Sequence, residues 1–474
     1  MRLSRFQGYH TLSALFIFIV TSCVIVYLVN HHHLLFAGTP FTDRLPLVSI
    51  TKNAVGTDYY AELARSFING KTYFLGPYNP LIYSHPNPYG MQAFLDNVII
   101  QDASFYNGKY YTYYGPVPAL FYVFVWLITQ RLPTDNLMIA VTLITINLFV
   151  LLFVYRLFLS KTFSFTLALT AVAVYVCIFF NPLYLLIYRD HTTALVARLF
   201  AVFLFGVGFL TLAEIFRDKF PKSRWIVFAA SSVMSLSMLC KANFILDCVI
   251  VSIFFCCVLL QRGRKVLLDY APVLLPPTFC ALSVLCYNYI RFDSPFQNGL
   301  KYITNSIDYF HGAKFFHFPQ NPAYFVYLLC KKTYEYFFIP FSIDGGGRLV
   351  ADQSGYPFVG NPELYTAGSI GFFVMVPILG FLIWKLFNIF RTNGFSFVVN
   401  FENSLVILAL LLFFMHFGFA LVLALQHFWF APEFVPFLAY VLVIKRSNLI
   451  RIIDQHKWIV VLLLLYSTVL LRAV

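Results

Sequence analysis

Several ionisable side chains stand beside long apolar stretches, where they could act on a charged substrate at a membrane surface. Asp58 opens a short helical pattern, Lys109 follows in the same polar segment, and Lys241 and Arg291 each end an apolar stretch. Cations flanked by aromatic rings can offset the charge of a lipid phosphate as it leaves low-dielectric surroundings. A carboxylate beside them could remove a proton from an incoming hydroxyl. The set indicates a site for a lipid phosphate and a hydroxyl nucleophile.

The composition shows which class of protein carries these residues. Of the 474 residues, 60% are hydrophobic and only 11% are charged, although 33 Lys and Arg against 20 Asp and Glu leave a net charge of +13. Soluble domains hold about 25% charged residues. The chain is therefore not a soluble enzyme, a disordered chain or a nucleic-acid binder. We predict an integral, multi-pass membrane protein.

Eleven apolar stretches are long enough to be membrane spans. They lie near 11–29, 137–155, 163–185, 194–215, 225–240, 243–260, 270–290, 367–389, 403–424, 430–444 and 458–472. A twelfth, 116–130, is short, and the basic segments fall on the inner side only if it lies on the outer interface. The sequence thus predicts an all-α polytopic protein with its N-terminus inside, its C-terminus outside, and long outer loops at 30–136 and 291–366.

The first long loop contains a short amphipathic helix over 58–70. Thr57 or Asp58 can cap its start and Gly70 its end. Aromatic and aliphatic side chains recur every four residues along it, so we expect it to lie on the membrane surface. The nine cysteines nearly all fall in apolar runs without metal-ligand spacing, and we interpret them as small buried hydrophobic residues.

Four segments, in order along the chain, resemble the GT-C glycosyltransferases, membrane enzymes that use polyprenyl-phosphate sugars. The segment from Asp58 to Arg65 is similar to the family's D-E-x-x-Y-A-E-x-A-R element. Gly108-Lys109 with the following Pro-Val-Pro resembles its G-K-P-P-L segment, and Leu239-Cys-Lys241 resembles its L-T-K turn. The stretch 287–299 is similar to its Y-N-x-x-R-F-G-S-P-x-x-x-G element. The resemblance covers roughly residues 10–300 and implies two juxtamembrane helices in the first outer loop.

The resemblance implies an inverting transfer of a sugar from a polyprenyl-phosphate donor to an acceptor hydroxyl on the outer face. Asp58 would be the general base, and Lys109, Arg291 and Lys241 would hold the lipid phosphate. The remaining candidates would bind the sugar or acceptor, or orient Lys109: Asp102, Asp190 and His191. No cofactor and no catalytic metal are expected. The partners would be the lipid-linked sugar donor, a glycan acceptor and membrane lipid, with no nucleic acid.

The chain departs from the family pattern at two positions. Tyr59 replaces the second residue of an acidic pair, and Asp293 stands where the family often has glycine. The expected organisation is a catalytic module over 1–300, including the loop 30–136, followed by the loop 301–366 and the C-terminal helices. In its compact size the chain resembles the O-antigen-modifying glucosyltransferases, which act on lipopolysaccharide. This resemblance implies a bacterial inner membrane and a periplasmic active site.

Other interpretations stay open from the sequence alone. Asp58 could be only a helix cap, Lys109 a lysine that reaches the interface, and Arg291 an anchor at a helix end. The rival functions are a lipid-linked glycan flippase or transporter and a glycan polymerase. Transporters often have internal repeats and polar groups at the bilayer midplane, whereas here the ionisable residues gather at one face.

Overall fold

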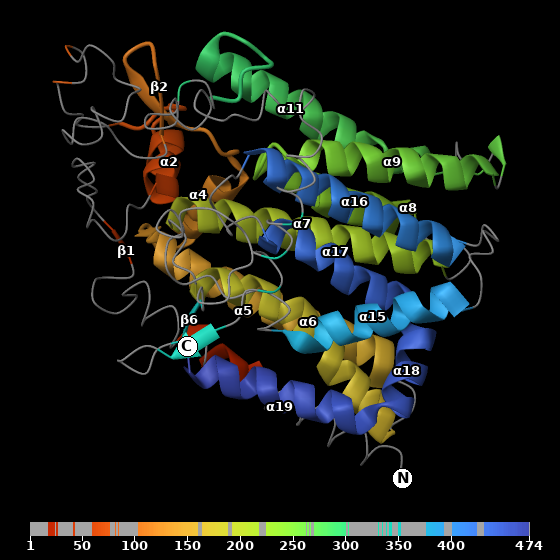
Figure 1. The fold of residues 1–474 in the computed structure, drawn as a ribbon. Helices are drawn as coiled ribbons and strands as arrows, with labels where there is room; N and C mark the ends of the chain where they lie inside the picture. Colours follow the sequence, from red (N-terminus) through yellow and green to blue (C-terminus); the bar gives the residue numbers. More distant parts are fainter. Residues whose placement is uncertain are drawn as a thin grey trace, which may run out of the picture. The chain divides into compact units, whose positions relative to one another are not determined.

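The computed structural model is predominantly helical (Figure 1). The structure describes short pieces of 18–26, 41–42, 341–343 and 349–351, a few single positions, and the ranges 59–75, 103–159, 164–187, 192–217, 224–261, 270–299, 376–392, 401–423 and 431–473. The chain packs into two compact units. The first comprises residues 1–25, 144–189 and 315–474, and the second comprises residues 26–143 and 190–314. The functional division predicted at residue 300 stays a prediction.

Helices are found where the sequence predicts spans from residue 137 onward. They are α5 (Asp135–Val154), α6 (Phe165–Ile187), α7 (Thr192–Arg217), α8 (Arg224–Leu236), α9 (Phe244–Gln261), α11 (Leu275–Phe292), α15 (Pro377–Thr392), α16 (Phe401–Leu423), α17 (Ala431–Ile444) and α19 (Lys457–Ala473). Within the described residues, three helical stretches are long and apolar enough to cross a membrane: Asp135–Phe158, Leu195–Arg217 and Phe244–Gln261. The structure thus supports a membrane protein without establishing the count of eleven spans.

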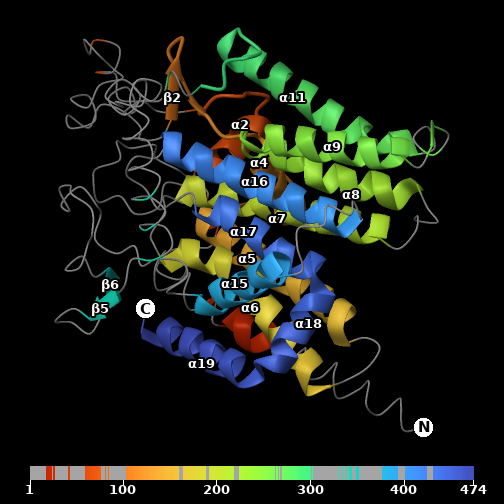
Figure 2. The ribbon, with the colours of Figure 1, turned by 45° about the vertical axis from the view of Figure 1, so that its right-hand side comes forward.

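The second unit holds a bundle of helices and the two helices expected in the first outer loop. In the bundle, α8 packs against α7, α9 and α11 (Figures 1 and 2). Gly208 of α7 lets α8 approach closely, because a Cβ there would lie 2.5 Å from the backbone nitrogen of Met234. The loop helices are α2 (Tyr59–Ile68) and α4 (Val117–Thr129), and they pack against each other.

The stretch at 116–130 folds as a helix of only 13 residues, α4. At about 1.5 Å per residue this is roughly 20 Å, short of a bilayer core. Val117, Ala119 and Tyr122 are buried, while Phe124 and Ile128 are more than half exposed. One packed face and one exposed apolar face suit the interfacial position that the charge pattern predicts.

The first unit is built mainly from α6 and α15 to α19. Helix α17 packs against α16, α6 and α15, and α19 packs against α6 and α15. The short helix α18 (Arg446–Gln455) lies between α17 and α19 in the chain and buries Leu449, Ile452 and Ile453. Asn147 of α5 is buried in this unit and donates a hydrogen bond to Thr21 Oγ1 at 2.6 Å, which joins the N-terminal helical piece to the bundle.

Among the described residues, three short antiparallel pairs of strands depart from the predicted all-α fold. They are β1 (Phe41–Thr42) with β4 (Leu132–Pro133), β2 (Ala103–Tyr106) with β3 (Lys109–Thr112), and β5 (Phe341–Ile343) with β6 (Leu349–Ala351). Each has at least one strand in a long loop that the sequence predicts to be outside the membrane. Hydrogen-bonded pairs satisfy the backbone groups of such loops where no helix forms.

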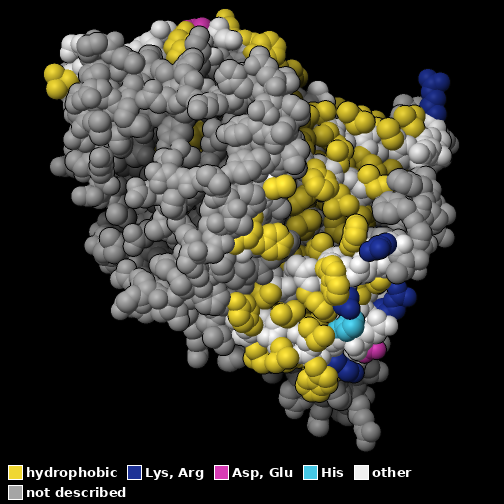
Figure 3. Space-filling view, viewed as in Figure 1, with side chains coloured by type: hydrophobic (Ala, Val, Ile, Leu, Met, Phe, Trp, Pro, Cys, Tyr) yellow, Lys and Arg dark blue, Asp and Glu magenta, His cyan; other side chains and the backbone are white. Residues whose placement is uncertain are grey.

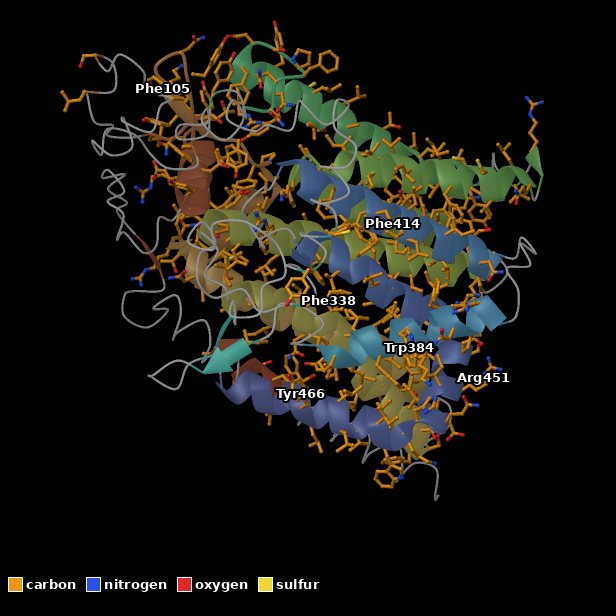
Figure 4. All side chains as sticks on the ribbon, viewed as in Figure 1. Phe105, Phe338, Trp384, Phe414, Arg451 and Tyr466 are labelled. Atoms are coloured by element: carbon orange, nitrogen blue, oxygen red, sulfur yellow. The ribbon has the colours of Figure 1, made fainter. Side chains whose placement is uncertain are left out.

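The surface of the described helices is largely apolar. Hydrophobic side chains cover much of the described part of the face in Figure 3, and charged side chains are few there. Many large apolar side chains on the bundle helices are more than half exposed, among them Phe279, Ile253 and Phe414, the last of which Figure 4 labels. A water-facing surface of this kind would be strongly unfavourable, whereas lipid tails solvate it.

Candidate active site

Helix α2 is held by a carboxylate from another helix. Asp135, the first residue of α5, is fully buried and accepts hydrogen bonds from the backbone N–H groups of Tyr60 (3.4 Å) and Ala61 (3.3 Å). It also accepts one from the Tyr122 hydroxyl at 2.8 Å. These two N–H groups are the ones that an N-cap side chain normally binds. Asp135 therefore acts as a cap for α2 from another helix, and the local caps predicted at Thr57 or Asp58 lie outside the described residues.

The end of α2 follows the prediction, and the segment after it docks on the hairpin of β2 and β3. The helix stops at Ile68, and Gly70 has a left-handed φ of +67°, as the predicted C-terminal glycine requires. The Phe74 N–H then donates to the Tyr110 carbonyl at 2.9 Å, and the Phe74 ring stacks on Tyr59 at 5.6 Å. The residues after α2 thereby connect the helix to β3.

The buried side chain of Glu62 holds the segment after α2 against the helix. Its side chain is 3% exposed, and Oε1 accepts the Leu75 N–H at 3.1 Å while Oε2 lies 3.7 Å from Arg65 Nη1. Burial raises the pKa of the Glu62 carboxyl, against the lowering influence of Arg65 and of the Leu75 N–H. The sequence gives a signal for this residue, because it is an acid on the apolar face of an amphipathic helix.

The hairpin of β2 and β3 carries Lys109. Asn107 and Gly108 form its two-residue turn with positive φ values of +46° and +73°. An Asn-Gly pair favours this turn, since both residues tolerate the left-handed conformation. The Lys109 side chain is exposed, and its Nζ lies 4.5 Å from the centre of the Tyr73 ring. Lys109 thus presents its charge to solvent beside an aromatic face.

Arg291 closes the base of the hairpin. It is 3% exposed at the end of α11, and its guanidinium donates to the Thr112 carbonyl and, at 2.8 Å, to Asn288 Oδ1. The rings of Tyr287 and Phe292 lie 4.0 and 4.7 Å from it. Within the described residues no carboxylate pairs with this cation, and its buried Nε has no hydrogen-bond partner. A buried charge of this kind is expensive unless an anion compensates it.

The segment after α11 is shaped by two left-handed residues. Asp293 has a φ of +54° at the end of the helix, which explains why glycine suits this position. Gly299 has a φ of +91°, and a Cβ there would lie 2.6 Å from both the Phe292 ring and Ser104 Oγ. Ser104 of β2 donates to the Gly299 carbonyl at 2.9 Å. The segment 293–299 is therefore bound to the hairpin along with Arg291.

The turn that contains Lys241 meets the turn before α4. The Gly115 N–H donates to the Cys240 carbonyl at 3.0 Å, and the Tyr60 hydroxyl donates to the Gly115 carbonyl at 3.4 Å. A Cβ on Gly115 would lie 1.9 Å from the Leu239 carbonyl oxygen. Lys241, half-buried, follows directly. Glycine at 115 is what allows the two backbones to meet.

The structure thus brings together, within one unit, the four segments that carry the family resemblance. Helix α2, the hairpin with the Gly115 turn, the 239–241 turn and the end of α11 are joined by direct hydrogen bonds. Asp58, Asp102, Asp190 and His191 lie outside the described residues. Asp58 immediately precedes α2 and Asp102 immediately precedes β2. In the part of the chain that the structure describes, no cluster of His, Cys, Asp or Glu could hold a metal ion.

Figure 4 labels Phe105, which lies on the hairpin. Its ring packs against Tyr110 on the opposite strand, with ring centres 4.9 Å apart. Tyr111, on β3, packs against Phe292 at 5.3 Å. Burial and the charge of Asp293 raise the pKa of Tyr111 to about 12, so this phenol stays protonated at neutral pH. The hairpin is held to α11 by aromatic packing as well as by Arg291.

Comparisons with known proteins add one structural match. No family model matches the chain. No curated protein matches it either. The solved apo structure of the oligosaccharyltransferase from Archaeoglobus fulgidus is similar, with a TM-score of 0.44 and 13% sequence identity, over 96% of this chain and 55% of that one. The chain thus spans about half the length of that protein, and at this level of likeness the function rests on the residues of the site.

We predict that Gly115→Ala destabilises the protein, because the new methyl group overlaps the Leu239 carbonyl. The expected loss is about 1–3 kcal/mol, the usual cost of overpacking. Thermal unfolding in detergent micelles measures it. Gly70→Ala is the control, because a Cβ at Gly70 meets nothing within 4 Å and only its left-handed φ is disfavoured. Equal melting temperatures for Gly115→Ala and wild type would contradict the packing of the two turns.

We predict that Glu62→Gln changes the pH dependence of stability. The folded state raises the pKa of Glu62. The contribution of Glu62 to the free energy of unfolding is therefore full below the ordinary pKa of a glutamate, and it is lost as the pH rises through the pKa of Glu62 in the folded state. The glutamine variant lacks this loss and should melt higher than wild type at neutral pH, but not in acid. Melting curves from acid to neutral pH check it. Asp454→Asn, an exposed carboxylate, is the control; parallel curves for Glu62→Gln and wild type would refute the prediction.

Proposed function

We propose that the chain is a membrane glycosyltransferase of GT-C type that transfers a sugar from a polyprenyl-phosphate donor to a glycan acceptor. The observation that carries the proposal is the position of Asp135. Because Asp135 binds the N–H groups of Tyr60 and Ala61, an aspartate at position 58 is not needed as their cap. This favours a role for Asp58 in the reaction over a role as the cap of α2.

The second support is the charge around Arg291. A buried guanidinium with a free Nε and no carboxylate partner among the described residues favours an anionic ligand. Lys109 is exposed on β3, the strand whose Thr112 carbonyl binds Arg291. Lys241 follows Cys240, the residue that binds Gly115. These three cations would hold the lipid phosphate, whose charge grows as the sugar leaves.

The proposed reaction is a single displacement. The acceptor hydroxyl oxygen attacks the anomeric carbon from the face opposite the phosphate, and the bond between that carbon and the phosphate oxygen breaks. Asp58 takes the hydroxyl proton, and the polyprenyl phosphate departs with the bonding electron pair. The anomeric configuration is inverted. Asp102, Asp190 and His191 would bind sugar or acceptor hydroxyls, and the activated donor makes a cofactor or metal unnecessary.

The site would face the outer side of the membrane. The basic segments between predicted spans favour this orientation, because Lys and Arg concentrate on the cytoplasmic side. An outward site near the membrane surface suits both a lipid-linked donor and an exported glycan. In a bacterium this would be the periplasmic face of the inner membrane, with the O-antigen of lipopolysaccharide as one acceptor class.

We predict that Asp58→Asn lowers sugar transfer about 100- to 10,000-fold, the usual contribution of a general base. Membranes are incubated with radiolabelled polyprenyl-phosphate sugars, and label in the glycan is counted. Asp454→Asn is the matched control, because this carboxylate is exposed and belongs to the other unit. Equal transfer by Asp58→Asn and wild type would remove Asp58 from the mechanism.

We predict that Lys109→Met raises the half-saturating donor concentration more than it lowers the maximal rate. Lys109 is exposed on the hairpin, so its loss should weaken phosphate binding without disturbing the fold. The same assay at varied donor concentration measures this. If wild type transfers no sugar in cells whose glycan it alters, the flippase or polymerase interpretation replaces the proposed one.

A further inference from the structure

The tip of the hairpin carries a group of side chains that the proposed mechanism does not use. Asn107 forms the turn and is exposed, and Asp293, also exposed, lies against it from the segment after α11. Asp293 Oδ2 accepts hydrogen bonds from the Tyr106 hydroxyl at 3.2 Å and from Asn107 Nδ2 at 3.4 Å. A carboxylate can accept about four hydrogen bonds. Asp293 therefore keeps acceptor capacity that points to a ligand with donor groups.

Three aromatic rings lie beside this carboxylate. The rings of Tyr106 and Tyr302 are 4.7 Å apart, and each lies 5.8 Å from the ring of Phe292. Phe292 is buried, whereas Tyr106 and Tyr302 are half-exposed. The two tyrosine rings thus present an aromatic surface that packs on the buried ring of Phe292. Such a surface covers apolar C–H groups while the carboxylate beside it binds polar ones.

The backbone at the tip is unusual at the same residues. Asn107 and Asp293 both adopt positive φ, +46° and +54°, a conformation that costs non-glycine residues free energy. Asn107 adopts it in the two-residue turn of the hairpin, and Asp293 adopts it as the residue that ends α11. At position 293 glycine would fit the backbone better, so the backbone conformation alone does not call for a carboxylate there.

We propose that this tip, formed by Tyr106, Asn107, Asp293 and Tyr302, is a subsite for the pyranose rings of the glycan acceptor. A pyranose has hydroxyl donors for the Asp293 carboxylate and for the Asn107 amide, and a C–H face for the tyrosine rings. The proposal rests on the proposed function, because it names the region that holds the second substrate. The negative charge of Asp293 disfavours a phosphate at the carboxylate itself.

The place of the tip relative to the cations supports this assignment. Thr112, which binds Arg291, lies at the base of β3, and the turn lies at its other end. Lys109 is the first residue of β3, next to the turn, and Thr112 is three positions further on, about 10 Å away. The hairpin thus has the guanidinium of Arg291 at its base, and the Asp293 carboxylate and the aromatic rings at its tip, beside Lys109. A donor phosphate at Arg291 and an acceptor ring at Asp293 can bind at opposite ends of the hairpin.

Photo-crosslinking tests the proposal in the full-length chain. The photoreactive residue p-benzoylphenylalanine is placed at Asn107 in cells whose glycan the protein alters, and those cells are fed tritium-labelled hexose. Light should attach labelled glycan to the protein, and the label should survive mild acid, which releases sugar held through a glycosyl phosphate. The control carries the photoreactive residue at Trp225, 78% exposed on α8, and should capture no glycan.

Three crosslinking outcomes would overturn the proposal: no carbohydrate on the Asn107 protein, acid-released label that identifies the donor, or phospholipid alone. This result does not depend on transfer, so it separates the acceptor subsite from the proposed function. If glycan is captured but wild type transfers nothing, the subsite stands and the glycosyltransferase proposal fails.

Transfer kinetics give the matched test of affinity. Asp293→Asn and Asp293→Gly should each raise the half-saturating acceptor concentration about tenfold, the effect of losing one hydrogen bond of roughly 1.4 kcal/mol. The half-saturating donor concentration should not change. Asp293→Gly also tests for misfolding, because glycine suits the φ of +54° and should leave the melting temperature at or near that of wild type. Unchanged acceptor dependence in both variants would contradict the subsite.

Discussion

The guanidinium of Arg291, buried at the end of α11, is the group on which the candidate site depends. Its fork binds the Thr112 carbonyl and Asn288 at the same time, so it joins the hairpin to the helix end. A lysine could not make both bonds in this planar geometry. Because the charge is buried without a carboxylate partner among the described residues, these bonds and the rings of Tyr287 and Phe292 must stabilise it. The same deficit of negative charge makes the site suited to an anion.

Two other contacts complete the arrangement, and both lie between segments distant in the chain. Gly115 brings the turn before α4 against Leu239 and Cys240, and Asp135 binds the N-terminus of α2. Each contact depends on the identity of one residue. A methyl group would separate the two turns, and without the Asp135 carboxylate two buried N–H groups would lose their acceptor. The site is therefore built by backbone contacts, with the charged side chains placed upon them.

The sequence predicts the helices well and the cross-chain contacts poorly. The interfacial helix at 58–70 forms as Tyr59–Ile68 and ends before Gly70, because a period of four and a terminal glycine are local signals. The sequence analysis predicts no hairpin there, although Asn107-Gly108 between aromatic residues is a strong local turn signal. Asp135 has no such signal. A cap supplied from more than seventy residues away leaves no local pattern.

The same distinction applies to function. Residue types at the edges of apolar stretches suggest lipid-phosphate chemistry, and the structure joins Arg291, the strand of Lys109 and the turn of Lys241 through direct contacts in one unit. The role of Asp293 needed the structure, because the sequence showed only a departure from glycine. The structure shows that Asp293 adopts the left-handed backbone conformation that glycine favours, and that its carboxylate accepts hydrogen bonds from Tyr106 and Asn107.

The central claim is that Arg291 holds the hairpin in place, and amide hydrogen exchange of Arg291→Lys tests it most directly. The variant keeps the charge but loses the fork that binds Thr112 and Asn288. Exchange should become faster across residues 103–112 and remain unchanged in α19, which belongs to the other unit. Identical exchange of the hairpin in the variant and wild type would contradict the account.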